Sequence, residues 1–166
     1  MREVSGGSRA ALESLFERYR GPIWRFFRRR VADPSRAEEL AQEVFLALLR
    51  SAPRYEPRGT FRSYLFAVAF NLLLAERRRA AVQVDPIESD PPAPAAPDAD
   101  ATLWVRHALA ELDPDDRELL MLREYEQLSY QEIADVYRVP LNTVRTRLFR
   151  ARAALRATLL PEGRGK

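Results

Sequence analysis

The sequence predicts an all-α protein of two small helical domains, a four-helix domain over residues 8–81 and a helix-turn-helix domain over residues 102–160. Apolar residues recur at three- and four-residue steps through most of the chain, and no alternating run is long enough to predict a sheet. Residues 82–101 contain five prolines, five acidic residues and no basic residue. This composition cannot bury a core, so it predicts an extended, Pro-rich acidic linker that forms no helix. The linker is either a simple spacer or an acidic strand that mimics nucleic acid in a basic channel of a partner.

The first domain is expected to contain four helices, over residues 8–19, 22–30, 35–50 and 61–81. Ser8 can cap the first helix, and Gly21-Pro22 is expected to end it, because Pro22 suits the first turn of a new helix. Asp33 or Ser35 can cap the third helix. Residues 54–60 are expected to form a loop, after which Thr60 can cap the fourth helix.

The second domain is expected to begin with two short helices, over residues 103–111 and 114–125, capped by Thr102 and Asp113. A helical hairpin over residues 129–156 follows. Ser129 and Glu132 have the spacing of a capping box, and residues 138–140 contain a proline that should end this helix. In the next helix, an apolar stripe at helical spacing is expected to be buried: Leu141, Val144, Leu148, Ala151 and Leu155.

The outward face of that last helix is strongly basic. No Asp or Glu occurs between Arg138 and Leu160, although a helix surface that is merely solvated usually mixes its charges. Arg and Thr side chains can contact base edges in a major groove, and Phe can pack on a thymine methyl group. The pattern favours a DNA-reading helix-turn-helix, and the alternative is a basic helical hairpin whose Phe149 lies in a second core. The face comprises Asn142, Arg145, Thr146, Phe149 and Arg150.

Several function classes are excluded or disfavoured by composition. The chain has no cysteine, which excludes disulfides and thiolate zinc sites within it. His107 is its only histidine, and no carboxylate pair has a recognisable catalytic spacing, so neither an enzyme nor a bound cofactor or metal is expected. The first ten residues lack an apolar signal core, and no stretch approaches the ~20 apolar residues of a membrane span. The expectation is a cytoplasmic protein without membrane contact.

Two further surfaces in the first domain have open interpretations. The helix over 61–81 combines aromatic and basic residues, which can stack unpaired bases, although aromatics at helical spacing are also typical of a core. Its arginines 77–79 either contact phosphates or form a solvated helix end. Glu38, Glu39, Gln42 and Glu43 form either a surface for a protein partner or a solvated face.

The motifs taken together resemble the bacterial sigma factors of the extracytoplasmic-function class (group 4) in the sigma-70 family. Residues 37–45, AEELAQEVF, resemble the part of region 2 that docks on the clamp of RNA polymerase. Residues 61–71, FRSYLFAVAFN, and the arginines 77–79 resemble the part that opens and holds the −10 element. Three segments resemble region 4, which reads the −35 element: LDPDDREL at 112–119, LSYQEIA at 128–134 and TVRTRLFRAR at 143–152.

The resemblance implies a non-enzymatic transcription initiation factor that binds core RNA polymerase at its clamp and flap, binds promoter DNA and is held by an anti-sigma factor. The implied polymerase-binding residues are Glu38, Glu39, Gln42, Glu43 and Phe45. The implied single-strand contacts at the −10 element are Tyr55, Arg58, Thr60, Phe61, Tyr64, Asn71, Arg77 and Arg78. The implied base contacts at the −35 element are the five outward residues of the basic helix face. The implied phosphate contacts are Arg138, Thr143, Arg147 and Arg152.

The chain departs from the family pattern at three positions, since Arg36 stands where an Asp is common, Phe70 where an Arg is common, and Tyr64 where a Trp is usual. Two other functions remain open from the sequence. One is a stand-alone helix-turn-helix regulator of duplex operators, which leaves the aromatic helix unused. The other is a helical adaptor protein that does not bind DNA.

Overall fold

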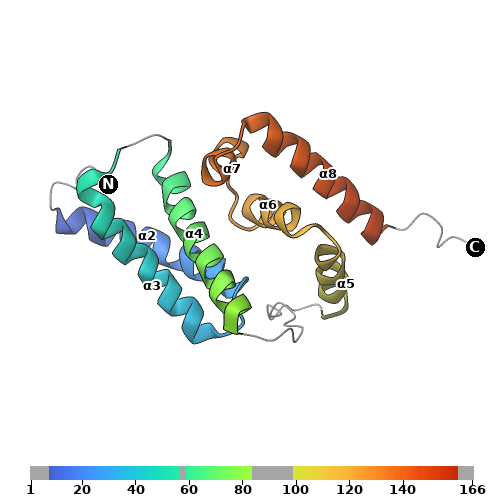
Figure 1. Ribbon diagram of the computed structural model, residues 1–166, viewed down its shortest axis with the longest axis horizontal. Coiled ribbons are helices and arrows are strands. Elements are labelled where there is room, and N and C mark those ends of the chain that lie inside the picture. Colours follow the sequence, from blue (N-terminus) through green and yellow to red (C-terminus); the bar gives the residue numbers. More distant parts are fainter. Residues whose placement is uncertain (1–7, 57–58, 84–98, 161–166) are drawn as a thin grey trace, which may run out of the picture. The chain divides into compact units, whose positions relative to one another are not determined.

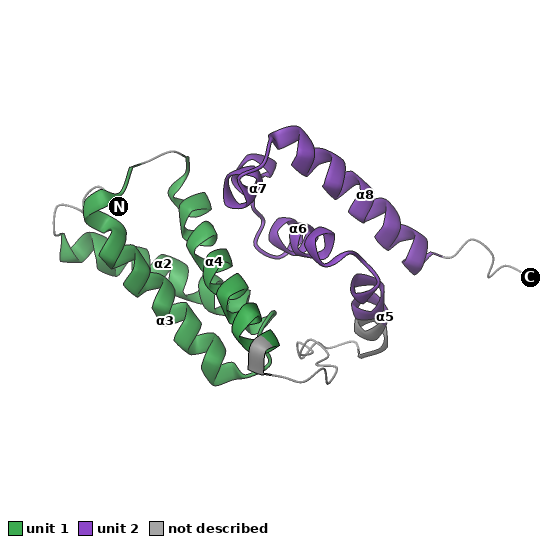
Figure 2. Ribbon diagram, in the orientation of Figure 1, with its two compact units in different colours: residues 1–94 green, residues 95–166 purple. Residues whose placement is uncertain are grey.

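The computed structural model describes residues 8–56, 59–83 and 99–160, and within them the chain forms seven α-helices and one short 3-10 helix. The chain divides into two compact units, residues 1–94 and 95–166 (Figures 1 and 2). The all-α prediction is confirmed. Most of the predicted linker lies outside the described residues, but α4 continues to Gln83 and α5 begins at Ala99, so the prediction that 82–101 is wholly non-helical is wrong at both ends.

The described residues of unit 1 form three α-helices and a 3-10 turn: α2 (Arg9–Arg28), α3 (Pro34–Ser51), η1 (Ala52–Arg54) and α4 (Phe61–Gln83). The predicted caps are present. Ser8 Oγ accepts the Ala11 N–H at 3.2 Å, Asp33 accepts the Ser35 N–H at 3.0 Å, and Thr60 Oγ1 accepts the Ser63 N–H at 3.0 Å. Asp33 is therefore the cap of α3, and Ser35 lies inside its first turn. In each case a side-chain oxygen satisfies an N–H that the helix leaves unpaired.

The predicted break at Gly21-Pro22 is wrong, because α2 runs through it with Pro22 inside the helix. The apolar pattern keeps its register across the proline, and Ile23, Phe26 and Phe27 behind it are fully buried. Burial of three large side chains outweighs the ~3 kcal/mol cost of an internal proline. Gly21 also lacks the Cβ that would crowd the proline ring. Unit 1 consequently contains three long helices in its described part, and not four.

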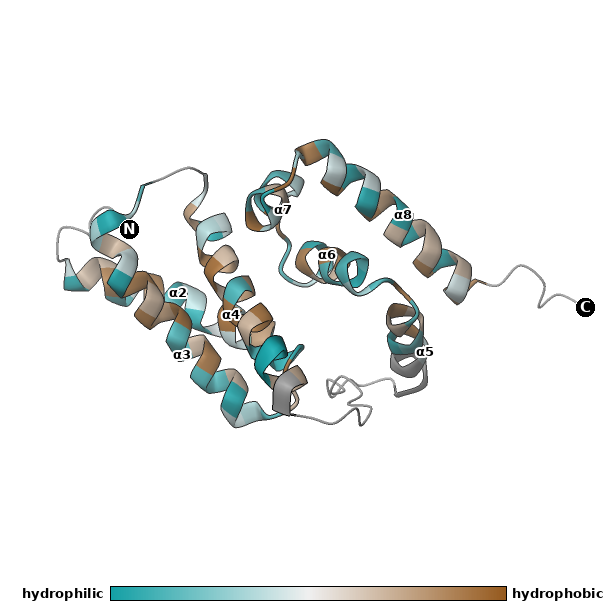
Figure 3. Ribbon diagram, in the orientation of Figure 1, coloured by the Kyte–Doolittle hydropathy of each residue, from teal (hydrophilic) through white to brown (hydrophobic). Residues whose placement is uncertain are grey.

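The core of unit 1 lies where these helices meet, and α3 packs against both α2 and α4. The Phe26 ring makes edge contacts with Phe27 and Phe66, with ring centroids 5.0 and 5.8 Å apart. Figure 3 shows that apolar residues recur along each helix and that α4 becomes hydrophilic toward its C-terminus. Further fully or nearly buried core residues are Leu40, Val44, Leu65, Ala69 and Leu73.

Unit 2 comprises α5 (Ala99–Ala110), α6 (Pro114–Glu124), α7 (Tyr130–Tyr137) and α8 (Leu141–Leu159). The prediction that Thr102 caps its first helix is wrong, because α5 begins three residues earlier. Asp113 caps α6 as predicted, with its carboxylate accepting the Asp115 N–H at 3.0 Å.

The predicted hairpin is confirmed as α7, a tight turn and α8. Ser129 Oγ accepts the Glu132 N–H at 3.1 Å, and Glu132 accepts the Ser129 N–H at 2.9 Å, which completes the capping box. Arg138 then adopts the left-handed conformation, with φ 55° and ψ 44°, and ends α7. The predicted apolar stripe of α8 is buried at its centre, at Val144, Leu148 and Ala151, and half-buried at both ends. None of the described helices is both long enough and apolar enough to cross a membrane.

Candidate functional site

The outward face of α8 is exposed along its whole predicted length. All five side chains predicted to meet base edges are exposed, and Phe149 reaches 74%. The alternative that places Phe149 in a second core is therefore wrong for unit 2. Arg145 Nη1 donates to Asn142 Oδ1 at 3.2 Å, and Thr146 Oγ1 donates to the Asn142 carbonyl at 3.0 Å. The buried centre of α8 fixes the helix in unit 2 and leaves this polar face available for a ligand.

The four predicted phosphate contacts lie in two different settings. Arg138 and Thr143 are exposed, at the turn and in the first turn of α8. Arg147 is only 26% exposed and donates to Asp116 Oδ1 at 2.8 Å, with two other aspartates within 4 Å. Burial alone would lower the pKa of Arg147, but the hydrogen bond to Asp116 and the nearby carboxylate charges outweigh burial and raise that pKa.

Arg152 is also paired within unit 2. It donates to Glu124 at 2.8 Å and to the Tyr130 hydroxyl at 2.7 Å, and these two bonds raise its pKa, the Glu124 bond more than the Tyr130 bond. Arg147 and Arg152 thus connect α8 to α6, and Arg152 also connects it to α7. The sequence shows the arginines but not these partners, which are 22 to 31 residues away along the chain.

Aromatic side chains gather around the N-terminus of α4. The rings of Tyr55 and Tyr64 meet edge to face with centroids 4.9 Å apart, and the Phe61 ring packs against Tyr19 at 5.5 Å. The Tyr64 hydroxyl donates to Ser51 Oγ at 2.6 Å. Tyr55, Phe61 and Tyr64 are half-buried, so each combines a packing contact with a partly accessible side chain.

The other predicted −10 residues are spread along α4. Thr60 is exposed beside the aromatic group, and Arg58 lies outside the described residues. Asn71, Arg77 and Arg78 are exposed. With 1.5 Å of rise per residue, Asn71 lies about 15 Å and Arg77 about 24 Å from Phe61 along the helix axis. At about 100° per residue, Asn71 and Arg78 lie on the side of α4 that carries Phe61 and Tyr64, whereas Arg77 lies about 160° around the helix from Phe61. These residues therefore do not form a single pocket, and Phe66 and Phe70 belong to the core.

The acidic residues of α3 lie beside an apolar groove. Glu38, Glu39 and Gln42 are exposed, whereas Phe45 is 8% exposed and packs its ring edge against Phe16 at 4.9 Å. The groove, of about 450 Å³, lies between α2 and α3 and is lined by Leu12, Glu13, Phe16, Glu17, Gln42, Phe45, Leu46 and Leu49. Three of these, Phe16, Leu46 and Leu49, are between 41% and 49% exposed. Sequence reasoning did not identify this groove, although α3 has more apolar residues than one buried face requires.

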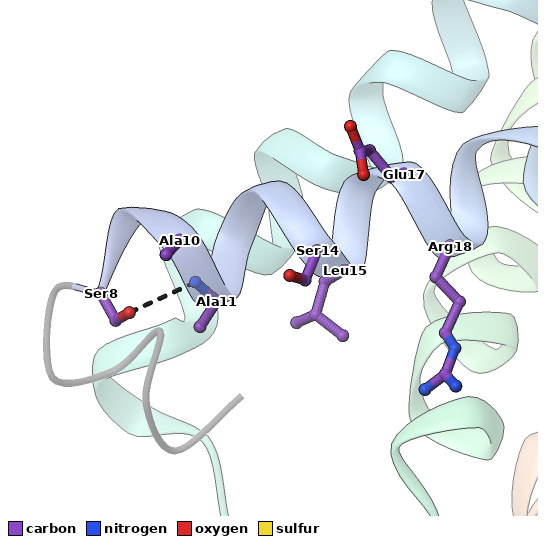
Figure 4. Close-up of a pocket in the computed structure, with 7 residues that line it drawn as sticks. All are labelled: Ser8, Ala10, Ala11, Ser14, Leu15, Glu17 and Arg18. Atoms are coloured by element: carbon purple, nitrogen blue, oxygen red, sulfur yellow. Dashed lines mark hydrogen bonds between the residues drawn. The ribbon is translucent and has the colours of Figure 1, made fainter.

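A second hollow runs along the N-terminal half of α2, and its lining residues do not form a recognisable catalytic or metal-binding group (Figure 4). Ser8, which bonds the Ala11 N–H, lies at one end of it and Arg18 at the other, and all the residues drawn come from the start of this one helix. Most of the side chains between them are short. Among the described residues no group of His, Cys, Asp and Glu side chains is arranged to hold a metal ion.

Both units match families of known proteins. Residues 15–82 match the family model for sigma-70 region 2, and residues 102–155 match the one for sigma-70 region 4. The chain is 33% identical over 165 residues to RNA polymerase sigma factor CarQ of Myxococcus xanthus, covering 96% of this chain and 95% of that protein. It is 32% identical over 173 residues to ECF RNA polymerase sigma factor SigL of Mycobacterium tuberculosis, covering 96% of each. The chain belongs to the extracytoplasmic-function sigma factors of the sigma-70 family.

This sigma factor directs transcription initiation as a non-catalytic subunit of RNA polymerase. The family resemblance predicted from the motifs is confirmed, and the stand-alone regulator and the adaptor are set aside. The fold also matches a solved structure of the sigma factor RpoE in complex with the anti-sigma factor NepR from Bartonella quintana. That match has a TM-score of 0.71 and 22% identity, and it covers 89% of this chain and 95% of the other.

Proposed function

We propose that this sigma factor reads the −35 element with the exposed face of α8. The observation that carries the proposal is the division of α8 into a buried apolar side and an exposed side with no acidic residue. Arg145, Thr146, Phe149 and Arg150 contact base edges together with Asn142, while Arg138 and Thr143 contact phosphates. Arg147 and Arg152 reach phosphate only by sharing or exchanging their carboxylate partners, which makes them weaker contributors.

The aromatic group at the start of α4 captures an unpaired base of the −10 element in this proposal. The accessible parts of the half-buried Tyr55, Phe61 and Tyr64 offer stacking surface, and Thr60 lies beside them. Arg58, which lies outside the described residues, is assigned to the same strand. Stacking and polar contacts offset the few kcal/mol that unstacking a base costs. Asn71 and Arg78 then follow the strand along the side of α4 that carries Phe61, and Arg77 reaches it from the neighbouring side of the helix.

The acidic part of α3 docks on the clamp of core polymerase through Glu38, Glu39, Gln42 and Glu43. Phe45 forms the floor of the adjoining groove, and its neighbours Phe16, Leu46 and Leu49 add apolar area to the same contact. Unit 2 contacts the polymerase flap. We assign region 2 to residues 8–81, the linker to 82–101 and region 4 to 102–160.

An anti-sigma factor is a further proposed partner of this chain. The support is the shared fold with RpoE, which has been solved in complex with the anti-sigma factor NepR. The same surfaces that meet polymerase are the ones that such a protein would have to cover in order to block initiation.

The decisive experiment is run-off transcription with purified core polymerase on a library of promoters from the source genome. We expect the full chain to co-elute with core polymerase and to start transcription at a set of promoters that share a −35 and a −10 sequence. A variant carrying Phe149→Ala and Arg150→Ala should still co-elute but initiate poorly. Initiation that is equal for the variant and the natural chain would overturn the assignment of α8.

A further inference from the structure

Arg36, in the first turn of α3, directs all three of its guanidinium nitrogens at carboxylates. Nε and Nη2 donate to the two oxygens of Glu76 at 2.9 and 2.8 Å, a bidentate pair that joins α3 to α4. Nη1 donates to Glu39 Oε2 at 2.8 Å and to Glu43 Oε1 at 3.2 Å, both on α3 itself. One cation therefore organises three acidic side chains from two helices.

The two sides of this network differ in exposure. The Arg36 and Glu76 side chains are only 23% and 21% exposed, whereas Glu43 is 36% and Glu39 is 62% exposed. A guanidinium is planar, so holding Nε and Nη2 on Glu76 also fixes the direction in which Nη1 points. Glu39 and Glu43 thus receive their hydrogen bonds from a donor that is anchored to another helix.

The positions of the carboxylates depend on this donor. Glu39 and Glu43 are four residues apart on α3, and like charges at that spacing repel each other. Arg36 lies three residues before Glu39, on the same helix face, and draws both carboxylates toward one point. Without it, repulsion would separate the two carboxylates, and each side chain would be free to populate several rotamers.

We propose that Arg36 is a positioning residue for polymerase docking, which holds Glu39 and Glu43 in a fixed arrangement while Glu76 holds Arg36. The inference rests on the proposed docking of α3 on core polymerase. Acceptors that are fixed before contact lose less side-chain entropy when a basic partner binds them, so positioning raises affinity. The bond to Glu76, and then the bond to Glu39, raise the pKa of Arg36, so that it stays charged throughout.

Arg36 also has an electrostatic effect on docking affinity that is opposite in sign to positioning, and this difference makes the inference testable. Arg36 also neutralises part of the acidic surface, so its removal leaves that surface more negative and more attractive to a basic partner. If Arg36 acts only by screening charge, Arg36→Gln will strengthen docking. If Arg36 acts by positioning, the same change will weaken docking.

The experiment measures the affinity of the full chain for core polymerase in the absence of promoter DNA. Arg36→Gln is expected to weaken binding about tenfold in the natural chain. In a chain already carrying Glu39→Gln and Glu43→Gln, the same change is expected to alter affinity less than about twofold, because its targets are gone. Glu76→Gln should also weaken binding, since it releases Arg36, and Arg36→Lys should not restore affinity because an ammonium lacks the planar fork.

Arg20→Gln is the matched control, because it removes one positive charge from an exposed side chain on the neighbouring helix that does not line the groove. We expect its affinity to stay within about twofold of the natural chain. Equal losses for Arg36→Gln in both backgrounds, or tighter binding by Arg36→Gln alone, would overturn the positioning role. If the natural chain itself fails to bind core polymerase, the proposed docking surface is overturned together with this inference.

Discussion

At the scale of single residues, the arginines of α8 lie in different environments. Arg150 is exposed on the outer side of α8, whereas Arg147 lies within 4 Å of Asp115 and Asp116 of α6 and of its cap Asp113. Both are cations on an acid-free stretch, and the sequence does not show the aspartate partners of Arg147. Their contributions to stability and to DNA binding should differ accordingly.

Arg150→Ala tests the readout of bases by α8. We expect it to weaken binding of the holoenzyme to the −35 duplex by ~1–3 kcal/mol and to relax the preference at one base position. The measurement is affinity for a set of duplexes that differ by one base pair each. An equal loss on every duplex would show that Arg150 contacts only the phosphate backbone.

Arg147→Ala should act mainly on stability. It leaves Asp116, whose side chain is 14% exposed, without its hydrogen bond and beside two other aspartates. We expect a loss of about 1–2 kcal/mol in unfolding free energy, less than for a fully buried pair because Arg147 is partly exposed. Asp116→Asn is the partner variant, and denaturant unfolding is the measurement.

The same two variants separate positioning from phosphate binding. If Arg147 only positions α8, then Asp116→Asn and Arg147→Ala will weaken DNA binding by similar amounts and leave its salt dependence unchanged. A selective loss for Arg147→Ala, with the slope of log affinity against log salt reduced by about one, would instead identify a phosphate contact.

The ionised Glu76 carboxylate is expected to make the free energy of unfolding depend on pH. The hydrogen bond from Arg36, and then the Arg36 charge, outweigh burial and hold the pKa of Glu76 below its ordinary value of 4.5. A carboxylate with a depressed pKa in the folded state adds stability above its unfolded pKa, and this stability is lost as pH falls through the folded pKa. We therefore expect the natural chain to lose unfolding free energy below about pH 4.5 more steeply than Glu76→Gln, as measured by denaturant unfolding. If the unfolding free energies of the two proteins fall equally steeply below about pH 4.5, this prediction is contradicted.

At the scale of helices, most of the caps that local chemistry specifies were predicted correctly, and the Thr102 cap is the exception. The Ser129 capping box and the Asp113 cap depend on residues within three positions of each other. The break at Gly21-Pro22 failed because a long-range effect, burial of Ile23 and its neighbours, keeps α2 continuous. The Arg36–Glu76 bond spans 40 residues, and the groove needs two helices, so neither was visible in the sequence.

Ser129→Ala tests how much α7 depends on its cap. The change removes one half of the capping box and is expected to cost ~1 kcal/mol. Because α7 leads directly into the turn before α8, the loss should appear as faster amide hydrogen exchange over residues 130–137. Ser35→Ala is the control, since Ser35 is an exposed serine in the first turn of α3 whose cap is Asp33, and it should cost less than ~0.5 kcal/mol. Equal effects of the two changes would show that the hydroxyl of Ser129 is not a cap in solution.

At the scale of the whole molecule, each unit has its own buried core and its own proposed ligand. Unit 1 carries the surfaces assigned to the clamp and the −10 strand, and unit 2 carries the helix assigned to the −35 element. In these proposed assignments, each ligand is contacted by residues of one unit. We therefore expect the covalent connection to act by mass action, because one bound unit would raise the local concentration of the other.

Division of the chain tests this role of the connection. Fragments 1–83 and 99–166 should each fold, which circular dichroism at helical wavelengths will check, since each retains the helices that form its core. A short tether supplies an effective concentration on the order of millimolar, so micromolar fragments mixed in trans should initiate transcription at least about 100-fold less efficiently than the intact chain. Raising the concentration of fragment 99–166 should progressively restore initiation at the same promoters. If the mixed fragments match the intact chain at micromolar concentration, the connection adds nothing; if they stay inactive at saturation, it carries a function beyond tethering.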